Sequence, residues 1–369
     1  MKRLLLLVLP PLFLVPVQAS GDGCPPESCG VQSAAVPGSP VVALRPQGVF
    51  RVYDVRTGRP RYTLPNATQS ADGRVAWSAD NLRGRTMLRR YDARTGRLVH
   101  SWVLGPRLWA PVVSADGRRV VLLDARGRTR IVVFDSRTAQ THSIDLRGSF
   151  EPEAISRDGR RLFLIEYLKG GYRVRVYDVA RGALRPGQLK PANEDEPMTG
   201  YPSYAIGAPD GHWLLTLYLK PHEAFVHALD LRRAIAYCLD LPGHGSAELQ
   251  DWALALGLDG RTLYAANGAL GLATRIDLAT LESSRPRRFV APLGSDQFVN
   301  TAMSPRGDLM YFGGLHGIWA WDLRADGVRG PYRPNHIGGL AFTPDGRRLI
   351  VITPRGRALW LDAATGRRI

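Results

Sequence analysis

The sequence predicts an all-β fold: a single β-propeller of four-stranded antiparallel blades, with eight blades favoured and seven as the alternative. Three observations lead to this prediction. A turn built on Asp-Gly recurs along the chain, a second turn that opens with Asp follows it in phase, and short apolar runs of strand length separate the two. Periods near 40 to 50 residues are typical of propellers and solenoids. A linear solenoid would leave its strand edges exposed, so a closed ring is favoured.

The first recurring turn has the form Ser-x-Asp-Gly-Arg. Aspartate accepts hydrogen bonds from nearby backbone N–H groups, and glycine takes the positive φ that other residues resist. An apolar run follows most copies, which indicates a strand buried on both faces, as in stacked blades. The glycines of the seven copies, separated by 39 to 52 residues, are Gly73, Gly117, Gly159, Gly211, Gly260, Gly307 and Gly346.

The second turn has the form Asp-x-x-Thr-Gly and predicts a three-residue hairpin that closes in the left-handed region. Each unit is then expected to begin with a first strand, an Asp-Gly turn and a second strand. A loop follows, and then a third strand that ends in Asp, a Thr-Gly turn and a fourth strand. The Asp positions of this phase are Asp54, Asp92, Asp135, Asp178, Asp230, Asp277, Asp322 and Asp362. These eight positions outnumber the seven Asp-Gly turns, and Pro37-Gly38-Ser39-Pro40 supplies the missing turn.

The two ends of the repeat array are incomplete. The last unit stops at Ile369 with almost no fourth strand. We therefore expect the segment around Val31 to complete that blade and lock the ring. Seven blades with surplus terminal strands is the alternative count.

These turns resemble the repeats of the bacterial YVTN and WD-repeat-like extracytoplasmic propellers, which carry the same Ser-Pro-Asp-Gly and Asp-x-x-Thr-Gly signatures. The resemblance covers about residues 31–369. It implies the propeller architecture and says little about activity, because this fold hosts unrelated functions.

The N-terminus predicts export. Residues 1–19 combine a basic start, a short apolar run and a small-residue cleavage site, which is the pattern of a signal peptide. The apolar run is shorter than the ~20 residues that span a bilayer, so we expect no transmembrane span. Residues 20–30 form a flexible Cys/Pro/Gly-rich leader and 31–369 the propeller. The location is then periplasmic or secreted, with a lipid anchor at Cys24 as the alternative.

The chain has three cysteines. Cys24 and Cys29 lie in the leader and are a disulfide candidate in an oxidising compartment. Cys238 lies in an apolar strand pattern and is expected to be a small buried hydrophobe. With no second close pair, these cysteines predict no zinc site.

The formal net charge is +16, carried almost entirely by arginine. An exported protein rarely meets nucleic acid, so we expect no nucleic-acid partner. The antiparallel blade places both tight turns on one face, which concentrates arginines there. This face either attracts an anionic surface or simply keeps the protein soluble and blocks strand-edge pairing. The arginines singled out are Arg118, Arg119, Arg160, Arg161, Arg347 and Arg348.

The opposite face carries the longer and more varied loops, where binding residues usually concentrate. On this face, acidic and aromatic residues stand at the start of the first strand of several units. They would suit a cationic, sugar-like or peptide ligand. Aromatic side chains at strand entries also pack between blades, and this alternative stays open. The binding candidates are Glu151, Glu153, Tyr201, Tyr204, Asp251, Trp252, Asn300 and His336.

No catalytic motif stands out in the sequence. We therefore expect a monomeric, non-catalytic, extracytoplasmic binding or scaffold propeller that presents its long-loop face to a protein or envelope component, with no cofactor and no bound metal. The alternative is a propeller enzyme, lactonase-like or dependent on a quinone or metal, with acidic residues at the channel mouth.

Overall fold

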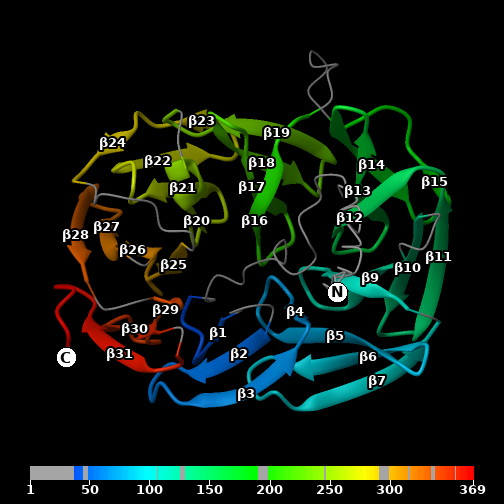
Figure 1. The fold of residues 1–369 in the computed structure, drawn as a ribbon, viewed down its shortest axis with the longest axis horizontal. Coiled ribbons are helices and arrows are strands. Elements are labelled where there is room, and N and C mark those ends of the chain that lie inside the picture. The colour runs from blue at the N-terminus through cyan, green and yellow to red at the C-terminus, as the bar shows by residue number, and fades with distance from the viewer. Residues whose placement is uncertain are drawn as a thin grey trace, which may run out of the picture.

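The computed structural model is a ring of eight antiparallel blades (Figure 1). It describes residues 37–44, 49–105, 107–124, 129–189, 198–244, 247–290, 299–314, 316–333, 337–353 and 355–369. The blue N-terminal blade lies beside the red C-terminal blade, which closes the ring. The prediction of eight blades is confirmed, and the seven-blade alternative is wrong. Residues 1–36, with the predicted signal peptide, the leader, Cys24 and Cys29, lie outside the described residues.

The first four blades follow the chain, and within each blade hydrogen-bonded neighbours follow chain order. Blade 1 has β1 (Val41–Leu44), β2 (Val49–Asp54) and β3 (Pro60–Pro65). Blade 2 has β4 (Ala67–Gln69), β5 (Val75–Leu82), β6 (Arg85–Asp92) and β7 (Leu98–Leu104). Blade 3 has β8 (Trp109–Val113), β9 (Arg119–Asp124), β10 (Thr129–Asp135) and β11 (Gln140–Leu146). Blade 4 has β12 (Ser149–Ile155), β13 (Arg161–Leu168), β14 (Gly171–Asp178) and β15 (Ala183–Leu184).

The remaining blades complete the ring. Blade 5 has β16 (Tyr201–Gly207), β17 (Trp213–Leu219), β18 (Ala224–Asp230) and β19 (Ile235–Asp240). The short 3-10 helix η2 (Ala247–Asp251) leads into blade 6, with β20 (Trp252–Leu256), β21 (Thr262–Asn267), β22 (Leu272–Asp277), β23 (Glu282–Ser283) and β24 (Arg287–Arg288). Blade 7 has β25 (Asn300–Met303), β26 (Leu309–Gly314), β27 (Gly317–Asp322) and β28 (Gly327–Tyr332). Blade 8 has β29 (Gly339–Phe342), β30 (Arg348–Ile352) and β31 (Ala358–Asp362).

The Asp-Gly turns form as the sequence predicts. In blade 4 the Ser156 hydroxyl donates to Asp158 Oδ1 at 2.6 Å, and the same oxygen accepts the Arg160 N–H at 3.0 Å. Gly159 closes the turn with φ of 72°, a conformation that glycine adopts without a steric penalty.

Neighbouring Asp-Gly turns touch around the ring. The Asp72 N–H donates to the Ala115 carbonyl at 3.1 Å, which joins blades 2 and 3. Arg119 Nη1 donates to the Arg157 carbonyl at 2.8 Å, which joins blades 3 and 4. On the far side of the ring, the space beside Gly346 is bounded by Pro305 of blade 7. The predicted common rim of tight turns is therefore confirmed.

The second turn is held by the aspartate that ends each third strand. In blade 2, Asp92 Oδ1 accepts the N–H groups of Arg94 and Thr95 at 3.0 and 2.9 Å. Gly96 then closes the turn at φ of 71°, directly against the Tyr62 ring of blade 1. A side chain at position 96 would clash with that ring, so this glycine serves both the turn and the packing between blades.

The ring closes between two blades that each show three strands among the described residues. Blade 1 begins with the predicted Pro37–Pro40 turn, where Gly38 has φ of 75° and the Pro40 carbonyl accepts the Val55 N–H at 3.0 Å. In blade 8, the Ile369 N–H donates to the Trp360 carbonyl at 3.1 Å. The predicted closing strand around Val31 lies outside the described residues and stays a prediction.

The hydrophobic core lies mainly between blades rather than at the axis. Second and third strands supply nearly continuous buried runs, as in β17 and β18 of blade 5. Cys238 corrects one prediction. It is exposed rather than buried, because β19 is the outer strand of its blade and buries only alternate residues.

Candidate functional site

A cavity of about 170 Å³ lies where the inner strands β4, β8, β12 and β16 face one another. Second strands line it only in blades 4 and 5, through Tyr167 of β13 and Tyr218 of β17 among others. The cavity therefore extends outward from the axis between these two blades. It also reaches the rim of tight turns, since Ala115 and Gly211 belong to its lining.

Two of the predicted binding residues, Glu151 and Glu153, line this cavity. Both lie on β12, and a register shift separates them. Pro152 pairs with Leu164 and Ala154 with Phe163, so Glu153 is the extra residue of a β-bulge. Bulges re-aim side chains and are frequent beside functional sites.

The Glu153 carboxyl has an unusual environment. The residue as a whole is partly exposed, but both carboxyl oxygens are buried and neither has a hydrogen-bond partner. Burial, with a smaller contribution from the nearby Glu151, raises the pKa of Glu153 to about 8. This carboxyl therefore holds its proton at neutral pH.

Glu151 differs from Glu153 in having a partner. The Tyr167 hydroxyl donates to Glu151 Oε2 at 2.6 Å. Burial still raises the pKa of Glu151, and the hydrogen bond from Tyr167 opposes part of that rise. The two carboxyls of one strand are therefore held differently: the Glu151 carboxyl is oriented by a tyrosine, and the Glu153 carboxyl is buried without a hydrogen-bond partner.

A polar seam continues outward from the cavity between blades 4 and 5. The rings of Tyr172 and Tyr218 stack with centroids 5.3 Å apart, and the His227 ring lies 5.6 Å from that of Tyr218. His227 is fully buried with neither ring nitrogen hydrogen-bonded, and burial lowers its pKa to about 4. The histidine is therefore neutral at physiological pH.

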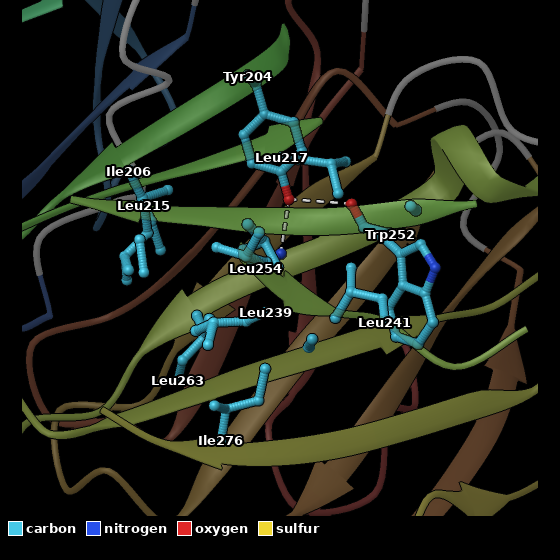
Figure 2. Packing of buried hydrophobic residues seen from close by; sticks show 14 of the residues in the cluster. Tyr204, Ile206, Leu215, Leu217, Leu239, Leu241, Trp252, Leu254, Leu263 and Ile276 are labelled. Atoms are coloured by element: carbon cyan, nitrogen blue, oxygen red, sulfur yellow. Dashed lines mark hydrogen bonds between the residues drawn. The ribbon is translucent and has the colours of Figure 1, made fainter. Parts of the chain in front are cut away.

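The predicted residues Tyr204 and Trp252 lie in a different place, the interface of blades 5 and 6 (Figure 2). The Tyr204 hydroxyl donates to the Trp252 carbonyl at 2.9 Å and accepts the Leu254 N–H at 2.6 Å. Tyr204 is 9% exposed and Trp252 is 0% exposed. Both aromatic side chains therefore pack between neighbouring blades, which is the alternative that the sequence analysis left open.

The other described loop-face candidates do not join the cavity lining. Tyr201 is 52% exposed at the start of β16, and Asp251 is 2% exposed at the end of η2. Asn300 is half-buried at the start of β25. His336 lies outside the described residues. The structure thus brings Glu151 and Glu153 together, and the other described candidates lie elsewhere.

Sequence analysis missed the contributions of the second strands. Thr216, Tyr218 and Tyr167 line the cavity, and the available signal was the presence of polar groups within the apolar runs of β13 and β17. A proline inside an inner strand was a further signal, since proline in a sheet marks an edge or a bulge. Pro152 and Pro202 both directly precede register shifts.

The predicted basic face is present at the tight turns, and part of it is structural. Arg119 pairs with Asp135 at 3.1 Å, and Arg161 Nη1 donates to the Arg232 carbonyl at 2.6 Å. Arg118, Arg160, Arg347 and Arg348 are exposed. A hollow of about 340 Å³ on this face contains both arginine and aspartate side chains. Its mixed charge distinguishes it from the purely acidic cavity.

In the described part of the chain, no helix is long and apolar enough for a membrane span. Among the same residues, no three side chains of His, Cys, Asp or Glu gather as metal ligands would.

The fold is shared with solved structures of low sequence similarity. The dihydro-heme d1 dehydrogenase NirN in complex with DHE matches with a TM-score of 0.53 and 18% identity, covering 89% of this chain and 71% of that one. The C-terminal WD40 domain of Sif2 matches with a TM-score of 0.51 and 12% identity, covering 88% and 94%. Hydrazine synthase of Kuenenia stuttgartiensis has a TM-score of 0.45 and 16% identity, covering 81% and 95%.

At these identities the likeness concerns the fold alone. No protein-family model and no curated protein matches the chain. The matches to the NirN and Sif2 structures support a WD40-like propeller fold. The narrower resemblance to the YVTN propellers stays a prediction.

Proposed function

We propose that this chain is a non-catalytic, extracytoplasmic binding propeller that holds a small ligand in the cavity between blades 4 and 5. The observation that carries the proposal is the Glu153 carboxyl, whose two buried oxygens have no hydrogen-bond partner and belong to a residue that lines the cavity. Buried polar groups are almost always hydrogen-bonded. A strongly perturbed titratable group in a hollow is therefore a candidate for ligand binding.

The lining favours binding over catalysis. It offers two carboxyls, hydroxyl groups and an amide among apolar side chains, and its described residues include no lysine, arginine or histidine. A catalytic site usually aims a cation or hydrogen-bond donors at the charge that develops in the transition state. The enzymatic alternative would need such a group from elsewhere, such as a metal or a quinone.

The extracytoplasmic location rests on the sequence of residues 1–19. The sequence also predicts that the long-loop face captures a protein or envelope component. Tyr201 is the most exposed aromatic candidate for that contact, because Tyr204 and Trp252 are buried. The cavity gives the proposal a more specific form, in which an envelope component of small size enters the channel.

A cavity-filling variant tests the proposal. The wild-type chain and Ala205→Leu would be screened by thermal shift against a library of fragments of up to about ten heavy atoms. Ala205 is buried and lines the cavity, so the larger side chain should occupy the ligand's space. We expect fragments that raise the Tm of the wild type and not that of Ala205→Leu.

The matched control is Ala279→Leu, because Ala279 is exposed in a turn of blade 6. It should respond to fragments as the wild type does. If Ala205→Leu does not fold, as judged by near-ultraviolet circular dichroism, Glu151→Gln takes its place. A library without hits, or hits that stabilise the cavity variant equally, would reject the proposal. Bound metal or a visible chromophore in protein purified from its native source would favour the enzyme instead.

A further inference from the structure

The chemistry of the cavity, taken together with the proposed function on which it rests, narrows the class of ligand. Glu153 is the central feature, because burying an unpaired charge is costly and burying an unpaired polar group is unfavourable. A neutral apolar ligand would leave both carboxyl oxygens unsatisfied. A ligand that brings hydrogen-bond donors and a positive charge would satisfy them.

Among the described residues that line the cavity, none carries a positive charge that could take that role. The titratable groups that face Glu153 are Glu151 on the same strand, Tyr167 on β13, Tyr172 on β14 and Tyr218 on β17. Each is acidic or neutral, and burial raises the pKa of both Tyr172 and Tyr218. The field inside the cavity therefore favours a cation and disfavours an anion.

The size of the cavity sets the size of the ligand. Its volume of about 170 Å³ is close to the ~150 Å³ of a cavity that accommodates benzene. Apolar side chains supply much of the wall, including Val113, Ala154, Ala205 and Leu214. A body the size of one ring fits, and a polymer does not.

A bare divalent metal suits this wall poorly. Calcium takes about six to eight oxygen ligands, whereas the lining combines two carboxyls with mostly apolar groups. An organic cation needs fewer polar contacts, and its apolar part gains from the apolar wall.

We infer that the cavity binds a compact organic cation, a protonated amine on an apolar body about one ring in size, with its ammonium group against Glu153 and Glu151. A rotation of the Glu153 side chain brings its oxygens, which solvent does not reach, to the ammonium group, which donates hydrogen bonds to them. The apolar body lies against the alanine and leucine side chains of β16 and β17.

Binding should be coupled to proton release. Glu153 keeps its proton up to about pH 8, and the ion pair requires that the proton leave. Affinity for an amine that stays protonated should therefore rise about tenfold per pH unit from pH 6 to 8 and level off above it. Replacing Glu153 with glutamine should remove this dependence.

Calorimetry with matched probes tests the inference. Benzylamine and cyclohexylmethylamine would be titrated into the full chain at pH 8 beside benzyl alcohol and cyclohexylmethanol, which have the same shape without the charge. We expect the amines to bind more tightly than the alcohols. In Glu153→Gln the affinity for the amines should fall about tenfold to a hundredfold, the loss expected for a charge-assisted hydrogen bond.

The control variant is Glu282→Gln, an exposed position on β23 of blade 6, which should bind as the wild type does. If Glu153→Gln misfolds, Glu151→Gln is measured in its place. Alcohols that bind as tightly as the amines, or an affinity for amines that survives Glu153→Gln and does not vary with pH, would overturn the inference while leaving the cavity a ligand site. A cavity that binds neutral fragments from the library but neither amine would overturn it equally.

Discussion

Blade 5 has two neighbours, and its two interfaces differ. Toward blade 6, Tyr204 of the inner strand β16 packs into a large apolar cluster, and its hydroxyl is held by two backbone groups of blade 6. Toward blade 4, the next residue, Ala205, lines a cavity in which Glu153 has no partner. Successive residues of β16 thus lie in two different interfaces. Tyr204 packs into the apolar cluster of the blade 5–6 interface, and Ala205 lines the cavity that reaches the blade 4–5 interface.

The two interfaces show that a buried polar group can have either of two roles. A group with its hydrogen bonds made fixes the geometry of two blades, whereas a group without them is costly unless something binds it. The satisfied Tyr204 hydroxyl of the blade 5–6 interface indicates a structural role. The unsatisfied carboxyl of the blade 4–5 interface indicates a site.

The largest expected effect is the dependence of stability on pH that Glu153 causes. Its pKa is about 8 in the folded protein and about 4.5 when unfolded, so the folded state binds the proton more tightly. The contribution of Glu153 to the free energy of unfolding is complete below pH 4.5. It should fall by about 1.4 kcal/mol per pH unit up to pH 8, about 5 kcal/mol in total.

Urea denaturation of the wild type and Glu153→Gln between pH 5 and 9 measures this effect as the difference between the two proteins. His227, whose pKa is lowered to about 4, acts in the opposite direction, because stability is lost as pH falls from 6.5 toward 4. Since both proteins contain His227, its contribution cancels in the difference. Parallel stability profiles would show that Glu153 is not a buried neutral acid.

A truncation in the solid interface is expected to have the next largest effect. Trp252→Ala removes a fully buried indole from the cluster between blades 5 and 6 and should lower the free energy of unfolding by about 3–5 kcal/mol. Denaturation midpoints in urea would measure the loss. The control Leu258→Ala, at a side chain that is 53% exposed, should change stability by less than about 0.5 kcal/mol. A similarly small loss for Trp252→Ala would mean that this interface is not tightly packed.

The fold was predictable from the sequence because its signals are local. Asp158 and Gly159 act within one turn, so their spacing reveals the blades without knowledge of any contact between them. Even the irregular first turn at Gly38 could be placed in phase. Cys238 was misplaced because an apolar pattern does not say which strand of a blade is outermost.

The site was predictable only in part, because it depends on contacts between blades. Glu151 and Glu153 could be selected as acidic residues entering an inner strand. The sequence could not show that a bulge leaves Glu153 without a partner, or that Tyr218 of the next blade faces the same cavity. Tyr204 was selected for the same reason as Glu151, and its packing against blade 6 gives it a different role.

The smallest effects should have opposite signs in the two interfaces. Tyr204→Phe keeps the ring but leaves the Leu254 N–H and the Trp252 carbonyl without their partner, so stability should fall by about 1–3 kcal/mol. Glu153→Met keeps a similar volume and removes a buried group that has no partner, so stability of the protein at pH 5, where the proton on Glu153 costs little, should rise by about the same amount. Both changes can be measured as shifts of the urea midpoint. A loss of stability in Glu153→Met would mean that the carboxyl is already satisfied within the protein, and the distinction between the two interfaces would then disappear.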